Sequence, residues 1–230
     1  MIANLRYAWR GHKARWRDER CELAAARQFI RPGSAACDIG AHKGNYLYWL
    51  SKWASEVVAF EPQPHLAAYL RTVAGPNVKV ETKGVYSKSG TMELAIPDGR
   101  PAEASFVSQD LATRTIAVTA VTLDSYFPTD NDLSFLKIDV EGAEIEVFRG
   151  AERILKKQKP ALLFECESRH IDGGDISPVF HFLSHFGYSG SFFASGARIP
   201  VAKFRPEIHQ KQDGDQFWQS PTYCNNFLFI

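Results

Sequence analysis

The chain has 230 residues, of which 45% are hydrophobic, and its formal net charge is +1. A chain of this length and composition can bury one large core, so we expect a single main domain. The near-zero net charge gives no reason to expect nucleic acid or an acidic membrane as a partner of the whole molecule. No apolar run approaches the roughly 20 residues that cross a bilayer, so no integral membrane segment is expected.

The four cysteines, Cys21, Cys37, Cys166 and Cys224, are far apart and form no C-x-x-C pair. Unpaired thiols of this kind favour a reducing compartment. The first 20 residues lack the apolar core of a signal peptide, because arginines and lysines interrupt them throughout. We therefore expect a cytoplasmic protein.

Residues 1–31 are predicted to form a helical extension that precedes the main domain, which we assign to residues 32–230. Leu5, Trp9 and Trp16 recur near helical spacing, with arginines and lysines between them. A charge-rich face of this kind is either solvated or touches an acidic partner or lipid headgroups. The sequence leaves both interpretations open.

A short apolar run followed by two glycines marks the first strand and turn of the main domain. Residues 35–39 are too few for a helix and are bounded by turn residues, so they are predicted to form a buried strand. Glycines after it allow positive φ angles and a close approach of the backbone to a ligand, because they lack a Cβ atom. The candidate cofactor-binding residues of this stretch are Asp38, Gly40, Ala41, His42 and Gly44.

The second predicted strand, residues 57–60, ends on Glu61 and Pro62. An acid at the end of the second strand is placed to accept hydrogen bonds from both hydroxyls of a ribose. Glu61 and Pro62 therefore join the candidate cofactor-binding residues.

Dinucleotide-binding folds also carry an acid at this position, so Glu61 alone does not distinguish a dinucleotide from S-adenosylmethionine. The sequence of the first turn distinguishes the two. A nicotinamide enzyme needs the G-x-G-x-x-G fingerprint, whereas this chain has Asp-x-Gly-x-x-x-Gly. The carboxylate of Asp38 would repel a pyrophosphate but suits a ligand that carries an ammonium group and a sulfonium. S-adenosylmethionine is such a ligand and is the predicted cofactor. The alternatives are an NAD-dependent oxidoreductase and an ordinary β-α turn.

The third strand is predicted to start at residues 78–81 and to end at residues 83–85. The backbone around Val85 would then meet the adenine of the cofactor, unless Gly84 is simply a turn glycine.

Residues 92–96 and 115–121 alternate apolar and polar side chains, as half-exposed antiparallel strands do. They define a small β-hairpin insertion over about residues 86–121. Between them, residues 97–114 form a long connection, and connections of this length in compact domains are usually functional or disordered. We interpret it as a candidate lid or substrate-contacting loop.

Residues 135–140 are predicted to form a central strand, with Lys137, Asp139 and Glu141 on one face. Burying an unpaired charge costs several kcal/mol, so these groups must pair, bind a ligand or stand at the open end of the sheet. Asp139 and Glu141 are at the carboxyl end, where ligands bind in such sheets, and are the candidate catalytic residues. Asp139 is also a candidate cofactor-binding residue.

Two neighbouring charges have structural explanations. Lys137 lies deeper in the strand and is the expected partner of an acid, while Glu144 is a first-turn acid favoured by the helix dipole.

After the central strand, a helix is predicted over residues 142–150, and a second short helix runs to about residue 158. The elements that follow are a strand over 161–164, a helix over 177–186, a strand over 188–193, a long loop over 196–223 and a strand over 226–230. The last two strands are expected to pair antiparallel. Glu165 and His170 follow a strand end and are further candidates for a general base, with a lone surface histidine as the alternative for His170. The aromatic pair Phe217-Trp218 is a possible contact in a homodimer.

With these residues in hand, the chain resembles the FkbM-type methyltransferases, a branch of the S-adenosylmethionine-dependent Rossmann-like enzymes. The resemblance runs from about residue 35 to 167 and includes the last five residues. Its motifs are Asp38-Ile39-Gly40-Ala41-His42-Lys43-Gly44, Phe60-Glu61-Pro62, Val121-Thr122-Leu123-Asp124 and Leu136-Lys137-Ile138-Asp139-Val140-Glu141-Gly142-Ala143-Glu144. His42 departs from the pattern, because the family commonly has asparagine there.

The elements and the resemblance together imply an α/β, Rossmann-like class I methyltransferase. We expect a mostly parallel seven-stranded sheet with helices on both faces, an antiparallel last strand and the hairpin insertion.

The resemblance implies O-methylation of a hydroxyl on a small molecule or sugar, with S-adenosylmethionine as cofactor. A catalytically degenerate methyltransferase-like binding module is the alternative. No metal site is predicted, although a metal-assisted variant would use Asp139 and Glu165. A nucleic-acid substrate is not expected, because the chain lacks both a base-flipping motif and a strong basic balance.

Overall fold

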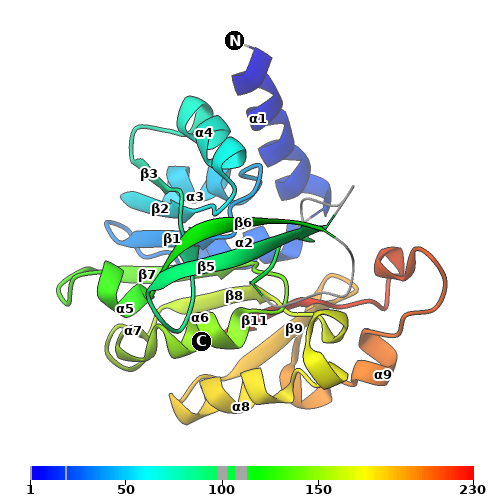
Figure 1. The fold of residues 1–230 in the computed structure, drawn as a ribbon. Coiled ribbons are helices and arrows are strands. Elements are labelled where there is room, and N and C mark those ends of the chain that lie inside the picture. The colour runs from blue at the N-terminus through cyan, green and yellow to red at the C-terminus, as the bar shows by residue number, and fades with distance from the viewer. Residues whose placement is uncertain (1, 19, 98–102, 107–112) are drawn as a thin grey trace.

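The computed structural model describes residues 2–18, 20–97, 103–106 and 113–230. Within this part of the chain the main sheet is built from β1 (Ala35–Ile39), β2 (Glu56–Phe60), β3 (Val78–Glu81), β7 (Leu133–Ile138), β8 (Ala161–Glu165), β9 (Gly190–Ala194), β10 (Ala197–Pro200) and β11 (Asn226–Phe229). They form an eight-stranded sheet in the order β10-β9-β11-β8-β7-β1-β2-β3 (Figure 1). Adjacent strands in the part β8-β7-β1-β2-β3 pair parallel, and β11 runs antiparallel between β8 and β9.

The predicted fold class is confirmed, and the prediction of seven strands was one short. The eighth strand is β10, which forms a hairpin with β9 inside the segment that was predicted to be a loop. That segment also holds a short helix, α9 (Pro206–His209). Four alternating residues at the edge of a sheet gave too weak a pattern to separate a strand from a turn.

Helices cover both faces of the main sheet. They are α1 (Ile2–Lys13), α2 (Arg20–Phe29), α3 (Leu47–Trp53), α4 (Pro64–Val73), α5 (Leu123–Tyr126), α6 (Glu144–Arg149), α7 (Glu152–Lys157) and α8 (Ser177–His185). None of the helices in the described ranges is long and apolar enough to span a bilayer.

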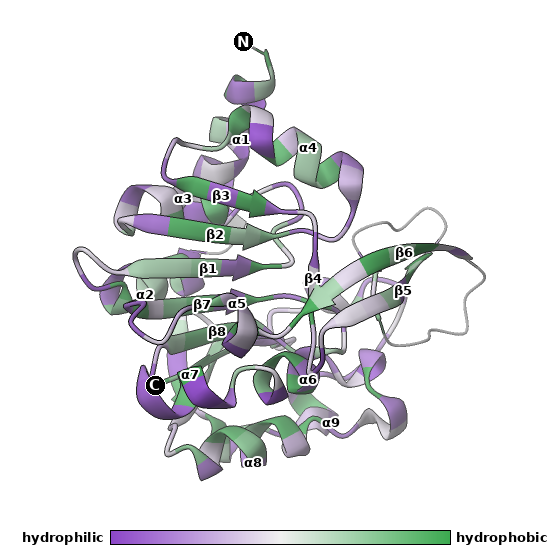
Figure 2. Cartoon of the chain, turned by 60° about the vertical axis from the view of Figure 1, so that its left-hand side comes forward, coloured by the Kyte–Doolittle hydropathy of each residue, from purple (hydrophilic) through white to green (hydrophobic). Residues whose placement is uncertain are grey.

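Side chains of the central strand β1 divide the buried residues into two cores. Cys37 and Ile39 belong to a core with α6, α7 and α8, whereas Ala36 belongs to a core with α2, α3 and α4. Successive strand residues point to opposite faces, and burial of both faces explains why most residues of the central strands are hydrophobic (Figure 2).

The hairpin insertion forms a separate three-stranded sheet in the order β4-β6-β5, from β4 (Gly84–Val85), β5 (Gly90–Pro97) and β6 (Thr113–Val121). The predicted antiparallel hairpin is therefore present. Val85 was expected at the end of the third strand of the main sheet, but it pairs parallel with Val121 in this smaller sheet. The smaller sheet lies beyond the carboxyl ends of the parallel strands (Figure 2).

The N-terminal extension is helical, as expected, but it bends. A π-helical turn over Ala14–Asp18 separates α1 from α2. Leu23 and Ala26 of α2 join the core on one face of the sheet, whereas α1 packs beside α3 and α4.

Asp124, part of the motif that follows β6, joins two helices. Its carboxylate accepts hydrogen bonds from the backbone N–H of Arg153 at 2.7 Å and of Ile154 at 3.0 Å, which are otherwise unpartnered donors in the first turn of α7. The guanidinium of Arg153 in turn donates to the carbonyls of Asp124 and Phe127. The carboxylate therefore caps one helix from another.

We expect Asp124→Ala to lower the free energy of unfolding by about 2 kcal/mol. The substitution removes two charge-assisted hydrogen bonds, which the carboxylate accepts from backbone N–H groups in the first turn of α7. Asp124→Asn should lose roughly half as much, since the amide oxygen still accepts. Urea unfolding measures both, with the exposed Asp130→Ala as control. Equal values for Asp124→Ala and Asp130→Ala would show that the cap does not contribute.

Candidate active site

Two adjoining hollows lie at the carboxyl ends of β1, β2 and β7. The larger holds about 680 Å³ of empty space and the smaller about 350 Å³, and both are lined by Gly40, His42 and Asp139. Together they form one cleft, which we call the strand-end cleft.

The turn after β1 brings the chain close to the end of β7. Gly40 has φ +80°, and a Cβ atom built on it would lie 1.8 Å from the carbonyl oxygen of Asp139. Only glycine fits there. His42 also has a positive φ, 47°, which is unusual for a residue with a side chain.

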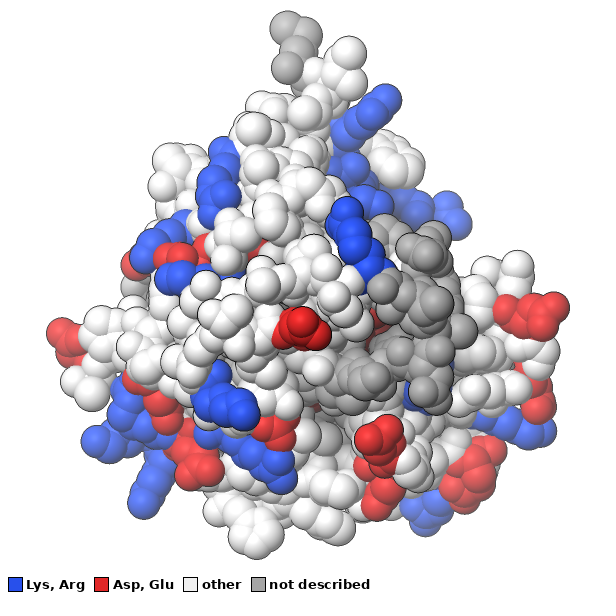
Figure 3. All heavy atoms as spheres, viewed as in Figure 1, with Lys and Arg blue, Asp and Glu red and all other residues white. Residues whose placement is uncertain are grey.

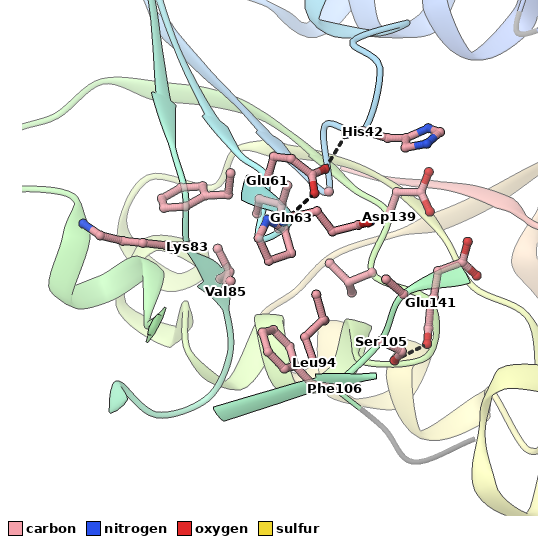
Figure 4. A pocket seen from close by; sticks show the side chains of 17 residues that line it. His42, Glu61, Gln63, Lys83, Val85, Leu94, Ser105, Phe106, Asp139 and Glu141 are labelled. Carbon is pink, nitrogen blue, oxygen red and sulfur yellow. Dashed lines mark hydrogen bonds between the residues drawn. The ribbon is translucent and has the colours of Figure 1, made fainter. Parts of the chain in front are cut away.

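Glu61 is buried at the end of β2, in the wall of the larger hollow. Its carboxylate accepts the backbone N–H of His42 at 2.7 Å and that of Gln63 at 2.9 Å (Figure 4). Burial raises the pKa of Glu61 to about 7, although the two backbone hydrogen bonds act in the opposite direction. The acid is held rigidly in a position where its ionisation is costly.

The smaller hollow is lined by Asp38, Gly40, Ala41, His42, Lys43, Asn45, Tyr46, Lys137 and Asp139. Asp38 and Lys137 are almost completely buried. The ammonium of Lys137 lies 3.4 Å from the carboxylate of Asp139 and donates to the carbonyl of Ile138 at 3.1 Å. Lys137 therefore has the structural role predicted for it, as the partner of an acid.

Asp139 and Glu141 turn their carboxylates toward the same side of the cleft (Figure 4). The strand ends at Ile138, and Glu141 adopts φ 53°, so the simple alternation of faces stops before this residue. A carboxylate oxygen of Glu141 lies 2.7 Å from Nδ1 of His170. The two residues form a buried pair beside the cleft.

The ionisation of this pair differs from that of free side chains. Burial raises the pKa of Glu141, and the negative charge of Asp139 adds to the effect. Burial lowers the pKa of His170, but the hydrogen bond and charge of Glu141 outweigh it, so this pKa lies above its usual value. The expectation of a lone surface histidine was wrong, because His170 is buried, lies against Gly142 and pairs with Glu141.

The insertion supplies the other wall of the cleft. Val85, Leu94 and Phe106 line its apolar side, and the hydroxyl of Ser105 donates to the backbone carbonyl of Glu141 at 2.7 Å (Figure 4). Residues 104–106 belong to the predicted substrate-contacting loop and do line the cleft. Residues 98–102 and 107–112 of that loop lie outside the described residues.

Nearly all the predicted site residues meet in the cleft. Lining the larger hollow are Gly40, His42, Glu61, Pro62, Val85, Asp139 and Glu141, and the smaller adds Asp38 and Ala41. Gly44 lines neither. A Cβ atom on it would lie 2.7 Å from the ring of Tyr7 in α1, so Gly44 makes room for that helix.

Several cleft residues were not predicted from the sequence. Gln63, Lys83 and Leu94 line the larger hollow, and Lys43 and Asn45 line the smaller. Lys43 and Asn45 lie on either side of Gly44 in the turn after β1. Their position in this turn could have predicted that they line the cleft.

The other two candidates for a general base, Glu165 and His170, line neither hollow. Burial and the charge of Asp139 hold the pKa of Glu165 well above its usual range, and Asn225 donates to its carboxylate at 2.5 Å. Within the described ranges, no group of three or more His, Cys, Asp and Glu side chains is arranged to hold a metal ion.

The Rossmann-like sheet with a cleft at its strand ends agrees with the class of S-adenosylmethionine-dependent methyltransferases. The family model of the methyltransferase FkbM domain matches residues 38–189, and the chain belongs to this family. The predicted resemblance and the predicted cofactor are both confirmed. A comparison with curated proteins gave no significant match.

Solved structures share the fold at low identity. A methyltransferase FkbM from Methylobacillus flagellatus KT is 15% identical with a TM-score of 0.53, and the match covers 91% of this chain but 51% of that one. A putative methyltransferase from Streptococcus mutans, in complex with SAH, is 13% identical with a TM-score of 0.53, and the match covers 93% and 97%. This chain thus spans about half the length of the first structure and nearly all of the second.

Glu144 lies in the first turn of α6, as expected, and accepts the backbone N–H of Gly142 at 3.1 Å, but its side chain is completely buried beside Cys166. Burial raises the pKa of Glu144 to about 7. The folded chain therefore binds the proton more tightly than the unfolded chain. The resulting stabilisation is complete below about pH 4.5 and is lost as the pH rises to about 7.

We expect Glu144→Gln to remove this pH dependence. At pH 8 the variant should exceed the parent in free energy of unfolding by about 2–3 kcal/mol, because no carboxylate is ionised in the core, and near pH 5 the two should be close. Urea unfolding at both pH values measures this. Glu152→Gln, at an exposed first-turn acid of α7, should leave the pH profile unchanged. If the free energy of unfolding of Glu144→Gln changed with pH as much as that of the parent, Glu144 would not be the source of this pH dependence.

Proposed function

We propose that the chain catalyses transfer of a methyl group from S-adenosylmethionine to a hydroxyl oxygen of a small molecule or sugar. The observation that carries this proposal is the Glu141 carboxylate, which lines the cleft, is paired with buried His170 and has a raised pKa. A carboxylate with a raised pKa is a better proton acceptor near neutral pH than an ordinary one. A hydroxyl acceptor is the group that needs such a base.

The residues of the cleft fit the cofactor. Buried Glu61 presents a carboxylate that suits two ribose hydroxyls, and Asp38 in the smaller hollow suits an ammonium group. The apolar side chains of Val85 and Leu94 suit an adenine ring. When bound, S-adenosylmethionine supplies a methyl group activated by its sulfonium.

The chain's own part in the reaction is positioning and proton removal. In this proposal Glu141 accepts the proton of the acceptor hydroxyl, and His170 holds the Glu141 carboxylate in place through the 2.7 Å contact. Asp139, at the junction of the two hollows, orients the acceptor. Positioning of two reactants contributes about 7–11 kcal/mol to catalysis, and a general base adds about 10²–10⁴-fold in rate.

Incubation with S-adenosylmethionine and a panel of sugars, amines and carboxylic acids tests the reaction type. Formation of the demethylated cofactor with hydroxylated acceptors, and a methyl ether in the isolated product, would support the proposal. Methylation of nitrogen or carboxylate oxygen would refute it. Cofactor binding without turnover on any acceptor would favour the degenerate binding module, and inhibition by a chelator would indicate the metal-assisted variant.

The raised pKa of Glu61 predicts pH-dependent cofactor affinity. Ribose hydroxyls donate to the ionised carboxylate, so affinity for S-adenosylmethionine should rise about tenfold between pH 6 and pH 8, as the group titrates near 7. Calorimetry at several pH values measures this. Glu61→Gln should bind at least about tenfold more weakly at pH 8 and lose the pH dependence. A pH-independent affinity in the parent protein would remove Glu61 from the ribose site.

Asp38→Ala gives a second test of the cofactor site. It should also weaken cofactor binding while the fold stays intact by circular dichroism, because it removes the carboxylate assigned to the ammonium group.

Glu141→Gln should lower kcat by about 10²-fold or more, while cofactor affinity changes by less than about threefold, because the amide cannot take the proton. His170→Asn should lower kcat less and shift the pH optimum, as a positioning residue does. The measurements are kinetics with the acceptor found above and calorimetry with the cofactor. Equal kcat for Glu141→Gln and the parent would make this residue structural.

A further inference from the structure

The helix α1 has two opposite faces with different surroundings. Tyr7, Gly11 and Ala14 are buried against the body of the molecule. On the opposite side, Ile2, Leu5, Trp9 and Trp16 are 68%, 66%, 63% and 64% exposed. We call these four side chains the outer face of α1. The spacing of three and four residues places Ile2, Leu5 and Trp9 on one side of α1, and Ala14 and Trp16 lie in the π-helical turn that follows the helix.

The inner face is firmly packed, so the outer face is fixed in position. A Cβ atom on Gly11 would lie 2.3 Å from the ring of Tyr48, which shows how closely the helix approaches α3. The indole N–H of Trp49 donates to the carbonyl of Gly11 at 2.7 Å, and Arg10 hydrogen-bonds with Tyr69 of α4. The exposure of four large apolar side chains is therefore a property of the folded surface.

Positive charge surrounds the outer face. Residues 2–17 contain Arg6, Arg10, Lys13, Arg15 and Arg17 and no Asp or Glu, and the first acids of the chain, Asp18 and Glu19, follow directly after them. Arg15 lies 4.8 Å from the ring centroid of Trp16, and Lys13 lies 5.9 Å from that of Trp9. In Figure 3, Lys and Arg spheres gather over α1 with no Asp or Glu among them. The near-zero charge of the whole chain conceals this local concentration.

We propose that the outer face of α1 docks on an anionic lipid bilayer, with the helix lying in the plane of the headgroups. Trp, Leu and Ile side chains opposite a packed face, flanked by Lys and Arg, are the pattern of interfacial helices. Indole rings suit the headgroup region, and each Lys or Arg near an anionic surface adds affinity. The chain thus binds at the membrane surface, which requires no membrane-spanning helix.

Charge complementarity selects the bilayer over a second copy of the chain. A two-fold dimer through this face would bring the same patch of each copy together, so the cations of one helix would meet those of the other. Like charges at such an interface are unfavourable. An anionic surface is complementary to the net positive charge of this segment and covers the apolar side chains as well.

The test is sedimentation of the full chain with vesicles of phosphatidylcholine alone and of phosphatidylcholine with 30% phosphatidylglycerol. We expect binding to the anionic vesicles, weak binding to the neutral ones, and release as salt is raised, because the charge contribution is screened. Trp9→Ala combined with Leu5→Ala should weaken binding by at least about tenfold. Arg6→Gln combined with Lys13→Gln should weaken it by about tenfold or more through charge alone.

Two controls keep the test specific. Trp218→Ala and Ile208→Ala remove exposed apolar side chains, 51% and 53% exposed, that lie far along the chain from α1, and should bind as the parent does. Unchanged affinity for S-adenosylmethionine in every variant shows that the fold and the strand-end cleft are intact.

Equal sedimentation with both kinds of vesicle, or no sedimentation with either, would overturn the proposal. So would a dimer in analytical ultracentrifugation that Trp9→Ala with Leu5→Ala converts to a monomer, since the face would then belong to a second copy. Because the readout is binding to lipid, the result does not depend on the proposed methylation reaction.

Discussion

The crowding of carboxylates at the ends of parallel strands is the constraint on which the site depends. β1, β2 and β7 run in the same direction, so Asp38, Glu61 and Asp139 are delivered to one edge of the sheet. Glu61 loses hydration on burial, and the charge of Asp139 adds a smaller effect, so the pKa of Glu61 is raised to about 7. The buried ammonium of Lys137 lies 3.4 Å from the carboxylate of Asp139, and its positive charge offsets part of the negative charge at this edge. A cationic ligand in the cleft would relieve the remainder, so the apo protein is arranged in favour of a ligand such as a sulfonium.

A second constraint fixes the geometry of the cleft. Gly40 touches the carbonyl of Asp139, and the N–H of Asp139 continues the β1–β7 hydrogen bonding by donating to Ile39 at 2.9 Å. The carboxylate of Glu61 then binds the N–H of His42 in the same turn. Backbone contacts and the Glu61 carboxylate thus join the three strand ends. The positive φ of His42 and of Glu141 costs some free energy, and these contacts hold both residues there.

The sequence predicted what depends on spacing and failed where distant segments meet. The order of short apolar runs, the Asp38–Gly44 turn and the acid after β2 define the sheet and most of the cleft, because strand ends are fixed by local pattern. The Glu141–His170 pair joins residues on separate loops, and no periodicity relates them. Glu144 follows the rule for a first-turn acid, yet the side chain is buried by packing that its own helix does not determine. The π-helical turn after α1 and the edge strand β10 were missed because their patterns are short.

The helix α1 connects the cofactor turn to the outside of the molecule. Its Tyr7 fills the space that Gly44 leaves open, while its outer face carries the exposed Trp9 and Trp16. The family match begins at residue 38, so this helix lies outside the part of the chain that defines the family. The strand-end cleft lies between strand ends and the insertion, all within the matched region. The segments outside that region are α1, α2 and the segment after residue 189, and we expect features particular to this chain there. Of these, α1 carries the clearest chemical pattern, because exposed apolar side chains and a concentration of positive charge coincide on one packed helix.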